Sequence, residues 1–204
     1  MGIFEQLFGL KCPGCDTPLT RATICLECEH ALVPRHVPGF VYLGDYQRFG
    51  RLSRSIKYGG QSKLAEVLGR KMALGVRQAE WQLAGVTAVP TMLHRQAQRG
   101  YNQSELLARA AAEALKVPFK PVLQRAVYTK SQTKKTLAER LALPEDSFRA
   151  TAKVGGVWLL IDDVLTTGTT YKRARAALLE AGAAKVHGAA IAVKSPHTLS
   201  EFSL

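Results

Sequence analysis

The order of apolar and polar residues predicts strands and helices that follow one another along the chain. A continuous apolar run at 157–161 is typical of a strand that is covered on both faces. Further strands are expected at 40–46, 86–89, 122–127 and 185–193. Apolar residues at helical spacing predict helices at 63–80, 104–116 and 171–181. Because strand and helix alternate, we expect an α/β fold, with a parallel sheet flanked by helices.

All four cysteines lie in the first 28 residues, as two C-x-x-C pairs. Each pair lets two thiolates face one ion from a tight turn, so we predict a structural Zn²⁺ site. Two disulfides and an iron–sulfur cluster are the alternatives. Prolines and a glycine follow at 34–39, which predicts a zinc-binding module at 1–34 and a second domain at 35–204. The predicted ligands are Cys12, Cys15, Cys25 and Cys28.

Charge narrows the choice of partners. The chain has 204 residues, and 28 Lys and Arg against 16 Asp and Glu give a net charge of +12, which indicates anionic partners such as phosphate compounds or nucleic acid. With 47% hydrophobic residues, the composition excludes a disordered chain and a disulfide-dense secreted scaffold. No apolar run reaches the roughly 18 residues that span a bilayer, and we recognise no targeting segment. We therefore expect a cytoplasmic protein with no membrane span.

Ten residues at the end of the 157–161 strand, IDDVLTTGTT at 161–170, carry the most chemistry. Backbone N–H groups at a strand-to-helix turn bind anions, and Thr hydroxyls add uncharged donors. Two carboxylates would repel a lone phosphate, but they suit a ligand that also carries a diol or a divalent cation. A sugar phosphate meets both conditions. The candidate residues are Asp162, Asp163, Thr166, Thr167, Gly168, Thr169 and Thr170.

Two common phosphate-binding motifs are excluded, because the sequence holds neither a G-x-x-x-x-G-K-[ST] run nor a G-x-G-x-x-G turn. A capped turn with solvated acids is the remaining alternative. The IDDVLTTGTT segment closely resembles the phosphoribosyl-pyrophosphate signature of type I phosphoribosyltransferases. With the Cys pairs, KYGGQSKLAEVLG (57–69), VPTMLHRQAQRGYNQSELLA (89–108) and SQTKKTLAER (131–140), the chain resembles the ComF family of competence-associated proteins. The resemblance implies a type I phosphoribosyltransferase fold at 35–204, behind the zinc module.

The resemblance also implies roles for single residues. Asp162 and Asp163 would be the catalytic acids, contacting the ribose hydroxyls directly or through Mg²⁺, while the threonine loop holds the 5′-phosphate. The segment 90–99 corresponds to the loop that receives pyrophosphate. The guanidinium groups of Arg95 and Arg99 suit that task, because they match phosphate oxygens two at a time. The alternative is that both arginines are solvated loop residues.

The polar stretch 128–150 is similar to the lid of the superfamily. A lid over a highly anionic ligand is expected to be basic, and its closure excludes water from a reactive glycosyl centre. A basic loop without a catalytic role is the alternative. The basic residues of this stretch are Lys130, Lys134, Lys135, Arg140 and Arg149.

Two functions follow from the resemblance. The first is a ComF-type protein that binds phosphoribosyl pyrophosphate and acts on incoming single-stranded DNA in natural transformation, with the competence helicase and DNA-processing proteins as partners. The second is an active phosphoribosyltransferase of nucleotide or small-molecule metabolism, with an unidentified acceptor and no DNA role.

One stretch bears on the choice between these functions. Cations and aromatic rings alternate at 46–63 and suit stacked single strands, unless the aromatics are core residues. Lys57 in this stretch could also face the phosphoribosyl ligand. The residues concerned are Tyr46, Arg48, Phe49, Arg51, Arg54, Lys57, Tyr58 and Lys63.

Overall fold

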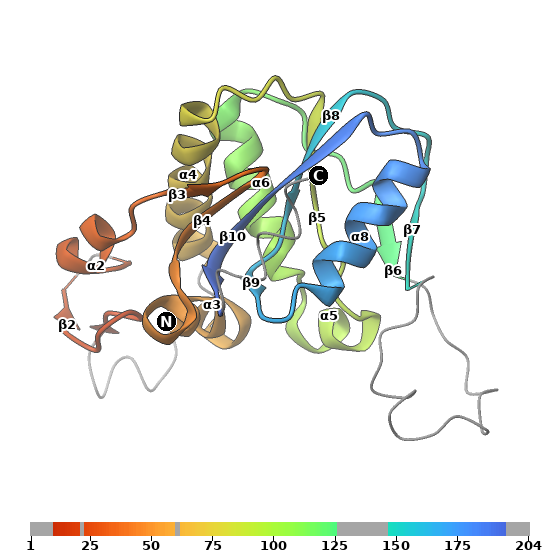
Figure 1. Cartoon of the computed structure of the whole chain (residues 1–204). Helices are drawn as coiled ribbons and strands as arrows, with labels where there is room; N and C mark the ends of the chain where they lie inside the picture. The colour runs from red at the N-terminus through yellow and green to blue at the C-terminus, as the bar shows by residue number, and fades with distance from the viewer. Residues whose placement is uncertain (1–9, 21–22, 60–61, 126–146, 195–204) are drawn as a thin grey trace.

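Parallel strands cross the middle of the molecule, and helices cover both sides of them (Figure 1). The computed structural model describes residues 10–20, 23–59, 62–125 and 147–194. The main sheet has six strands in the order β3-β4-β10-β8-β5, with β9 paired to β10. Only the edge pair β3–β4 is antiparallel. The strands are β3 Arg35–Val37, β4 Phe40–Asp45, β5 Gly85–Ala88, β8 Val157–Ile161, β9 Val164–Leu165 and β10 Lys185–Val193.

Alternate side chains of the central strands enter two apolar layers, one on each face of the sheet. In β8, Leu159 and Ile161 belong to one layer and Trp158 and Leu160 to the other. Three helices cover the first layer: α3 (Tyr46–Gly59), α4 (Ser62–Gln78) and α6 (Gln103–Leu115). One helix, α8 (Thr169–Glu180), covers the second. The prediction of a sheet with helices on both faces is confirmed, and the antiparallel β3 is the one departure from a parallel order.

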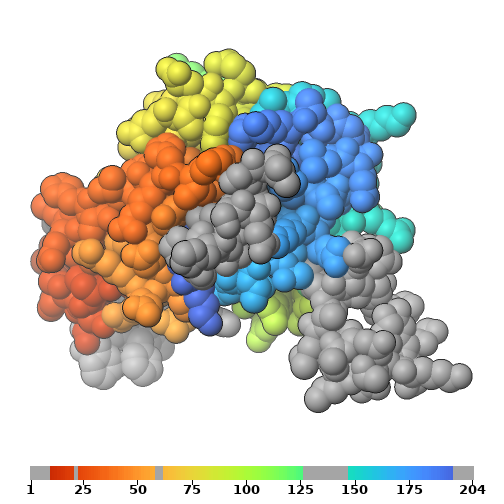
Figure 2. All heavy atoms as spheres, viewed as in Figure 1, coloured from red at the N-terminus to blue at the C-terminus, as the bar shows by residue number. Residues whose placement is uncertain are grey.

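Smaller elements lie at the ends of this sandwich. β1 (Leu10–Lys11) pairs with β2 (Pro18–Leu19), and with α2 (Leu26–Ala31) they form a cysteine module that carries all four cysteines. Figure 2 places this module, in red, on the side of the molecule away from α8, in blue. β6 (Leu123–Arg125) pairs with β7 (Phe148–Ala150) beside α8.

Most of the predicted elements are confirmed, within a few residues at their ends. The strands at 40–46, 86–89, 157–161 and 185–193 are β4, β5, β8 and β10, and the three predicted helices are α4, α6 and α8. The strand at 122–127 is confirmed over its described part, as β6, but in a separate sheet. No helix in the described part of the chain is long and apolar enough to cross a membrane. The division at residue 34 stays a prediction.

Besides the six-residue α2 of the cysteine module, two described helices were not predicted from the pattern. α5 (Leu93–Arg99) lies within the segment expected to be the pyrophosphate loop, and it buries none of its residues, so it has no apolar periodicity to detect. α3 buries Phe49, Leu52 and Ile56, but polar residues surround these positions and hide their spacing. Both helices follow the carboxyl end of a strand, which is where the candidate site lies.

Gly69 offers a test of the packing between α4 and α6. A Cβ at this position would lie 2.6 Å from the Cβ of Ala110 and 2.7 Å from the carbonyl oxygen of Leu107. Gly69→Ala should therefore lower the free energy of unfolding by about 1–2 kcal/mol, because moving the helices apart outweighs the gain of up to about 1 kcal/mol in helix propensity. Urea denaturation measures the change. Gly155→Ala is the control, since its Cβ would meet nothing within 4 Å; equal stabilities of the two variants would contradict the prediction.

Candidate functional site

A cavity of about 310 Å³ opens at the edge of the sheet where the parallel strands end. β4 leads there into α3, β5 leads into Val89 and Pro90, and β8 leads into Asp162 and Asp163. Ligands of open α/β sheets bind at this edge, because strand ends and helix starts meet there. The cavity therefore contains the acidic pair that the sequence singles out.

Asp162 is buried at the end of β8. Its Oδ1 accepts hydrogen bonds from the backbone N–H of Asp163 at 2.8 Å and from the hydroxyl of Ser104 at 3.1 Å. Burial, and next the charge of Asp163, raise the pKa of Asp162 from 3.8 to about 7. This carboxyl group is therefore close to its titration point at neutral pH.

Asp163 is also buried, but it has a cationic partner. Its Oδ2 lies 2.5 Å from Nζ of Lys57 and accepts a hydrogen bond from the hydroxyl of Ser53. Lys57 and Ser53 lie one turn apart on α3, so a single helix supplies both partners. The expectation that Lys57 faces the ligand site is consistent with this contact, because both Lys57 and Asp163 line the cavity.

The threonine loop borders the same cavity with two of its members. Thr166 and Thr170 line it, while the hydroxyls of Thr167 and Thr169 lie 3.1 Å from each other at an exposed position. Gly168, with φ of 76°, is the N-cap of α8. The start of α8 thus lies next to the acidic pair, as the sequence predicts.

The two candidate arginines are placed differently. Arg95, on α5, lines the cavity. Nη1 of Arg99 donates to Oε1 of Gln103 at 3.3 Å, and it is Gln103 that lines the cavity. The predicted lid residues Lys130, Lys134, Lys135 and Arg140 lie outside the described residues, and Arg149 is exposed on β7.

Sequence reasoning gave no site role to Ser53, Gln103, Ser104 or Arg125, and it placed Arg54 in a stretch expected to contact DNA rather than at this cavity. All five residues line it. Ser104 lies in the RGYNQSELLA segment that helped to identify the family, so its place in that motif was a usable signal. A lone serine or arginine within a polar helix carries no such signal, and only the fold brings Ser53, Arg54 and Arg125 to the site.

Two of the candidate stacking residues, Tyr46 and Phe49, pack with the core of the domain. The ring of Phe49 is 2% exposed and belongs to the core, which supports the alternative of a core aromatic for this residue. Tyr46 is half-buried and packs against the same core. The side chain of Tyr58 lies outside the described residues. The cations beside them are exposed or paired: Arg48 is exposed, and Arg51 pairs with Asp16.

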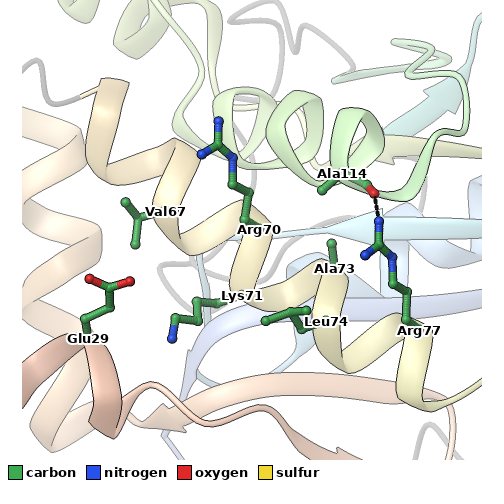
Figure 3. A pocket seen from close by; sticks show the side chains of 8 residues that line it. All are labelled: Glu29, Val67, Arg70, Lys71, Ala73, Leu74, Arg77 and Ala114. Atoms are coloured by element: carbon green, nitrogen blue, oxygen red, sulfur yellow. Dashed lines mark hydrogen bonds between the residues drawn. The ribbon is translucent and has the colours of Figure 1, made fainter. Parts of the chain in front are cut away.

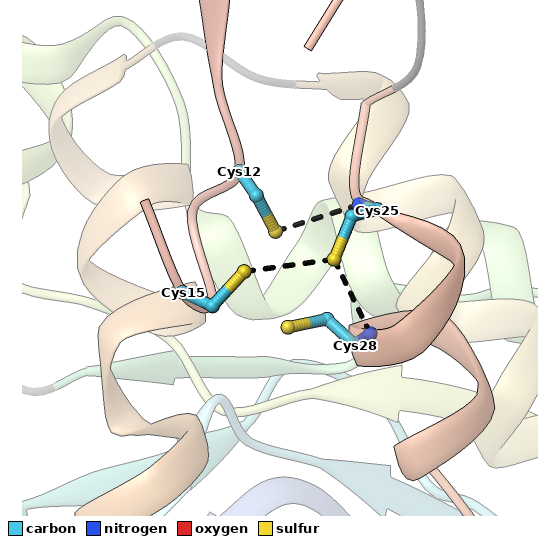
Figure 4. Close-up of side chains that lie close together, drawn as sticks. All are labelled: Cys12, Cys15, Cys25 and Cys28. Atoms are coloured by element: carbon cyan, nitrogen blue, oxygen red, sulfur yellow. Dashed lines mark hydrogen bonds between the residues drawn. The ribbon is translucent and has the colours of Figure 1, made fainter. Parts of the chain in front are cut away.

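The four cysteines point toward one another (Figure 4). Their sulfur atoms all lie within 4.8 Å of one another, and those of Cys15 and Cys25 are 3.6 Å apart. Ligands at about 2.3 Å from a tetrahedral Zn²⁺ are separated by about 3.8 Å, so this spacing fits a single ion. All four thiols are free, as the ligands of a metal ion must be. The cluster can bind a metal.

Groups around the sulfur atoms also suit a metal site. The backbone N–H of Cys25 donates to Sγ of Cys12, and that of Cys28 donates to Sγ of Cys25, both at 3.4 Å. A hydrogen bond with the hydroxyl of Thr17 is the main cause that lowers the pKa of the Cys15 thiol to about 6. A Cβ at Gly14 would lie 2.8 Å from Sγ of Cys28, so a side chain there would enter the sulfur cluster.

A second cavity, of about 300 Å³, lies between the cysteine module and α4 (Figure 3). Glu29 of α2 lies on one side of it, and Val67, Lys71 and Leu74 of α4 lie on the other. Arg77, farther along α4, donates to the carbonyl oxygen of Ala114 on α6. The cysteine module therefore sits against the helical layer on one face of the sheet.

Comparison with known proteins gives a domain match and several relatives. Residues 102–201 match the model of the phosphoribosyl transferase domain. DNA utilization protein YhgH of Escherichia coli K12 is 30% identical over 184 residues, covering 86% of this chain and 80% of that protein. Competence protein ComFC of Streptococcus pneumoniae is 29% identical, covering 90% and 80% of the two chains. Competence protein F of Haemophilus influenzae is 26% identical, covering 86% of each.

Solved structures are similar over part or most of the chain. The glutamine phosphoribosylpyrophosphate amidotransferase of Bacillus subtilis matches with a TM-score of 0.44 and 26% identity, over 65% of this chain and 26% of that one. An adenine phosphoribosyltransferase matches with a TM-score of 0.43 and 15% identity, over 87% and 94%. The matched domain, the sheet and the cysteine cluster together give a phosphoribosyltransferase type I fold with an N-terminal four-Cys module.

Asp162 should make stability depend on pH. The pKa of Asp162 is raised on folding, so between pH 3.8 and about 7 the folded protein binds more protons than the unfolded chain. This contribution to stability is fully present below pH 3.8, falls as pH rises, and is lost once pH has risen through about 7. Asp162→Asn removes it. We expect the variant to gain melting temperature relative to the unaltered protein as pH rises from 5.5 to 8.

His187 has the opposite effect on stability, because burial lowers its pKa to about 4. The variant and the unaltered protein both carry His187, so its effect cancels in the difference between their melting temperatures. Differential scanning fluorimetry across this range measures the difference in melting temperature. A difference that stays constant with pH would contradict the raised pKa of Asp162.

Proposed function

The chain belongs to the ComF family of competence proteins, and we propose that it binds phosphoribosyl pyrophosphate with Mg²⁺ in the cavity at the strand ends. The protein would use this site while it acts on incoming single-stranded DNA in natural transformation. The names of the relatives, which refer to competence and to DNA utilization, support this role. Competence helicase and DNA-processing proteins are the proposed partners.

One observation carries the proposal: two buried carboxyl groups and a set of cations share one cavity. Asp162 and Asp163 are each less than a tenth exposed. The cations that line the same space are Arg54, Lys57, Arg95 and Arg125. The acids would repel a ligand that carries only phosphates, and a neutral sugar would gain nothing from the positive charge of the cavity. A phosphorylated sugar with free hydroxyls satisfies both sets of groups.

Each group has a role in binding such a ligand. Asp162 and Asp163 would accept hydrogen bonds from the ribose hydroxyls or hold Mg²⁺, which prefers carboxylate oxygens. The ion, when bound, would offset the negative charge of the pyrophosphate. The Thr166–Thr170 loop at the start of α8 would donate hydrogen bonds to the 5′-phosphate. Arg95 would contact the pyrophosphate directly.

Two cations would change partner when the ligand enters. Lys57 would leave Asp163 for a phosphate group, and this would free the carboxylate for the ribose hydroxyls or the ion. Arg99 would turn from Gln103 toward the pyrophosphate. Binding would then replace one ion pair and one hydrogen bond within the protein by ion pairs with the ligand, so little unpaired charge is buried at any stage.

We also propose that the ion held by the cysteine module is Zn²⁺. Thiolates are soft ligands that Zn²⁺ accepts readily, and four of them complete a tetrahedron. An ion held in this way has no open position for substrate, so its role would be structural. The boundary of the zinc module at residue 34 is part of this proposal.

Calorimetry with phosphoribosyl pyrophosphate and Mg²⁺ tests the main proposal. We expect binding by the unaltered protein and at least a tenfold loss of affinity in Asp163→Asn, because hydrogen bonds to a charged group contribute roughly 1.5–3 kcal/mol. Glu113→Gln, at an exposed position of α6, is the control and should bind as the unaltered protein does. If the unaltered protein binds no ligand with or without Mg²⁺, the proposal is wrong.

Direct binding of single-stranded DNA is a separate prediction. Contacts with phosphates release counterions, so the affinity for a fluorescent oligothymidine should fall steeply between 50 and 200 mM salt, with a logarithmic slope of about −0.7 per contact. Arg48, exposed on α3, is a candidate contact, and Arg48→Gln should make the slope less steep by about 0.7. Fluorescence anisotropy gives both values. Weak binding with no salt dependence would argue against direct recognition of DNA.

A further inference from the structure

Helix α3 presents two polar faces to two different parts of the molecule. Successive residues of a helix are turned by about 100°, so Arg51 and Ser53 lie about 200° apart, while Ser53 and Lys57 lie within about 40° of each other. Ser53 and Lys57 contact Asp163. Arg51 faces the opposite way and contacts the cysteine module. The helix thus joins the candidate metal site to the candidate ligand site.

The contact on the metal side is made with the cysteine loop itself. Nη2 of Arg51 donates to both carboxylate oxygens of Asp16, at 2.6 and 2.5 Å. Asp16 directly follows Cys15, and its backbone N–H donates to the carbonyl oxygen of Cys12 at 2.9 Å. A change in the path of this loop would therefore move the partner of Arg51.

Apolar packing adds to this exposed ion pair, which alone would contribute only up to about 1 kcal/mol. Cys12, Cys28 and Leu32 are buried in one cluster with Phe49, Leu52 and Ile56 of α3. The module itself has only two strands of two residues and a helix of six. Elements so short bury little apolar surface of their own, so their order depends on the metal and on the main core.

On the ligand side, α3 supplies both partners that hold Asp163 in place. Lys57 is one-quarter exposed and lies within the cavity, and Ser53 is buried beside it. A shift or a loosening of α3 would alter both contacts at once. Since Asp163 is proposed to bind the ribose hydroxyls or Mg²⁺, its position bears directly on ligand affinity.

We infer that the cysteine module positions α3, and through it Asp163, so that metal binding and phosphoribosyl-pyrophosphate binding support each other. Asp16 and Arg51 are the positioning residues that join the two sites. This inference rests on the proposed function of the cavity. Coupling between two binding sites is reciprocal, so the metal should raise the affinity for the ligand, and the ligand should slow the loss of the metal.

The first experiment measures the coupling in both directions. Elemental analysis establishes the metal content, expected to be one zinc per chain. Calorimetry then compares the affinity of metal-loaded and metal-depleted protein for phosphoribosyl pyrophosphate with Mg²⁺, and we expect at least a fivefold loss on depletion, the lower end of typical coupling energies. In the loaded protein, the same ligand should slow transfer of the metal to a chelating dye. That second readout needs no metal-free protein and is valid even if depletion unfolds the chain.

Variants at the joining pair separate positioning from folding. The Arg51→Gln and Asp16→Asn variants should keep their metal but bind the ligand several-fold more weakly. The ligand should also slow the transfer of metal to the dye less in these variants than in the unaltered protein. Arg51→Lys keeps the charge and should retain most of the effect. Lys120→Gln is the control, since it removes one positive charge from an exposed position that does not line the ligand cavity, and it should change neither readout.

The outcomes are distinct. Failure of the metal-loaded, unaltered protein to bind the ligand overturns the proposed function, and the coupling with it. Normal binding that metal depletion, Arg51→Gln and Asp16→Asn all leave unchanged, with metal transfer unaffected by the ligand, overturns the coupling alone.

Discussion

Two neighbouring carboxyl groups at the end of a buried strand set the conditions that the rest of the site must meet. Burial and the charge of its neighbour both favour the neutral form of Asp162. The protein treats the two acids differently: Asp162 receives a hydroxyl and a backbone N–H and has its pKa raised to about 7, while Asp163 receives the ammonium group of Lys57. One acid is thus near its titration point and the other is held in an ion pair.

The groups that meet this condition come from elements far apart in the sequence, and the sheet topology brings them together. Ser53 is 110 residues from Asp163, and Ser104 is 58 residues from Asp162. Asn102 holds Ser104 in place: its side chain caps α6 and donates to the carbonyl oxygen of Val89, at the end of β5. Because β4, β5 and β8 are parallel, their carboxyl ends share one edge, and α3, α6 and the acids must converge there.

How much of this could be predicted depends on whether a feature is local. Cys12 to Cys28 and the 161–170 segment are contiguous motifs, so their residues and their order indicate the chemistry. The structure brings the four sulfur atoms together and places Thr166 and Thr170 beside the acidic pair. The buried strands are long apolar runs, which a pattern detects. α3 was not predicted because its apolar residues Phe49, Leu52 and Ile56 are few among polar ones. Phe49, with Tyr46 and Tyr58, was instead interpreted as part of a stacking surface. Ser53, Arg54 and Arg125 act only through tertiary placement, which no local pattern encodes.

The placement of α3 also changes the meaning of the basic stretch at 48–63. The net charge of +12 suggested an anionic partner, and this stretch was interpreted as the part of the chain that would contact nucleic acid. In the folded chain, Arg51 pairs with Asp16 and Lys57 with Asp163, while Arg54 lines the ligand cavity. Three of its cations are therefore committed to the protein's own acids or to the cavity. Arg48 and Lys63 are exposed and are the part of this stretch that DNA could contact. A surface of this size offers few phosphate contacts, so tight DNA binding would require basic residues from elsewhere in the chain or a partner protein.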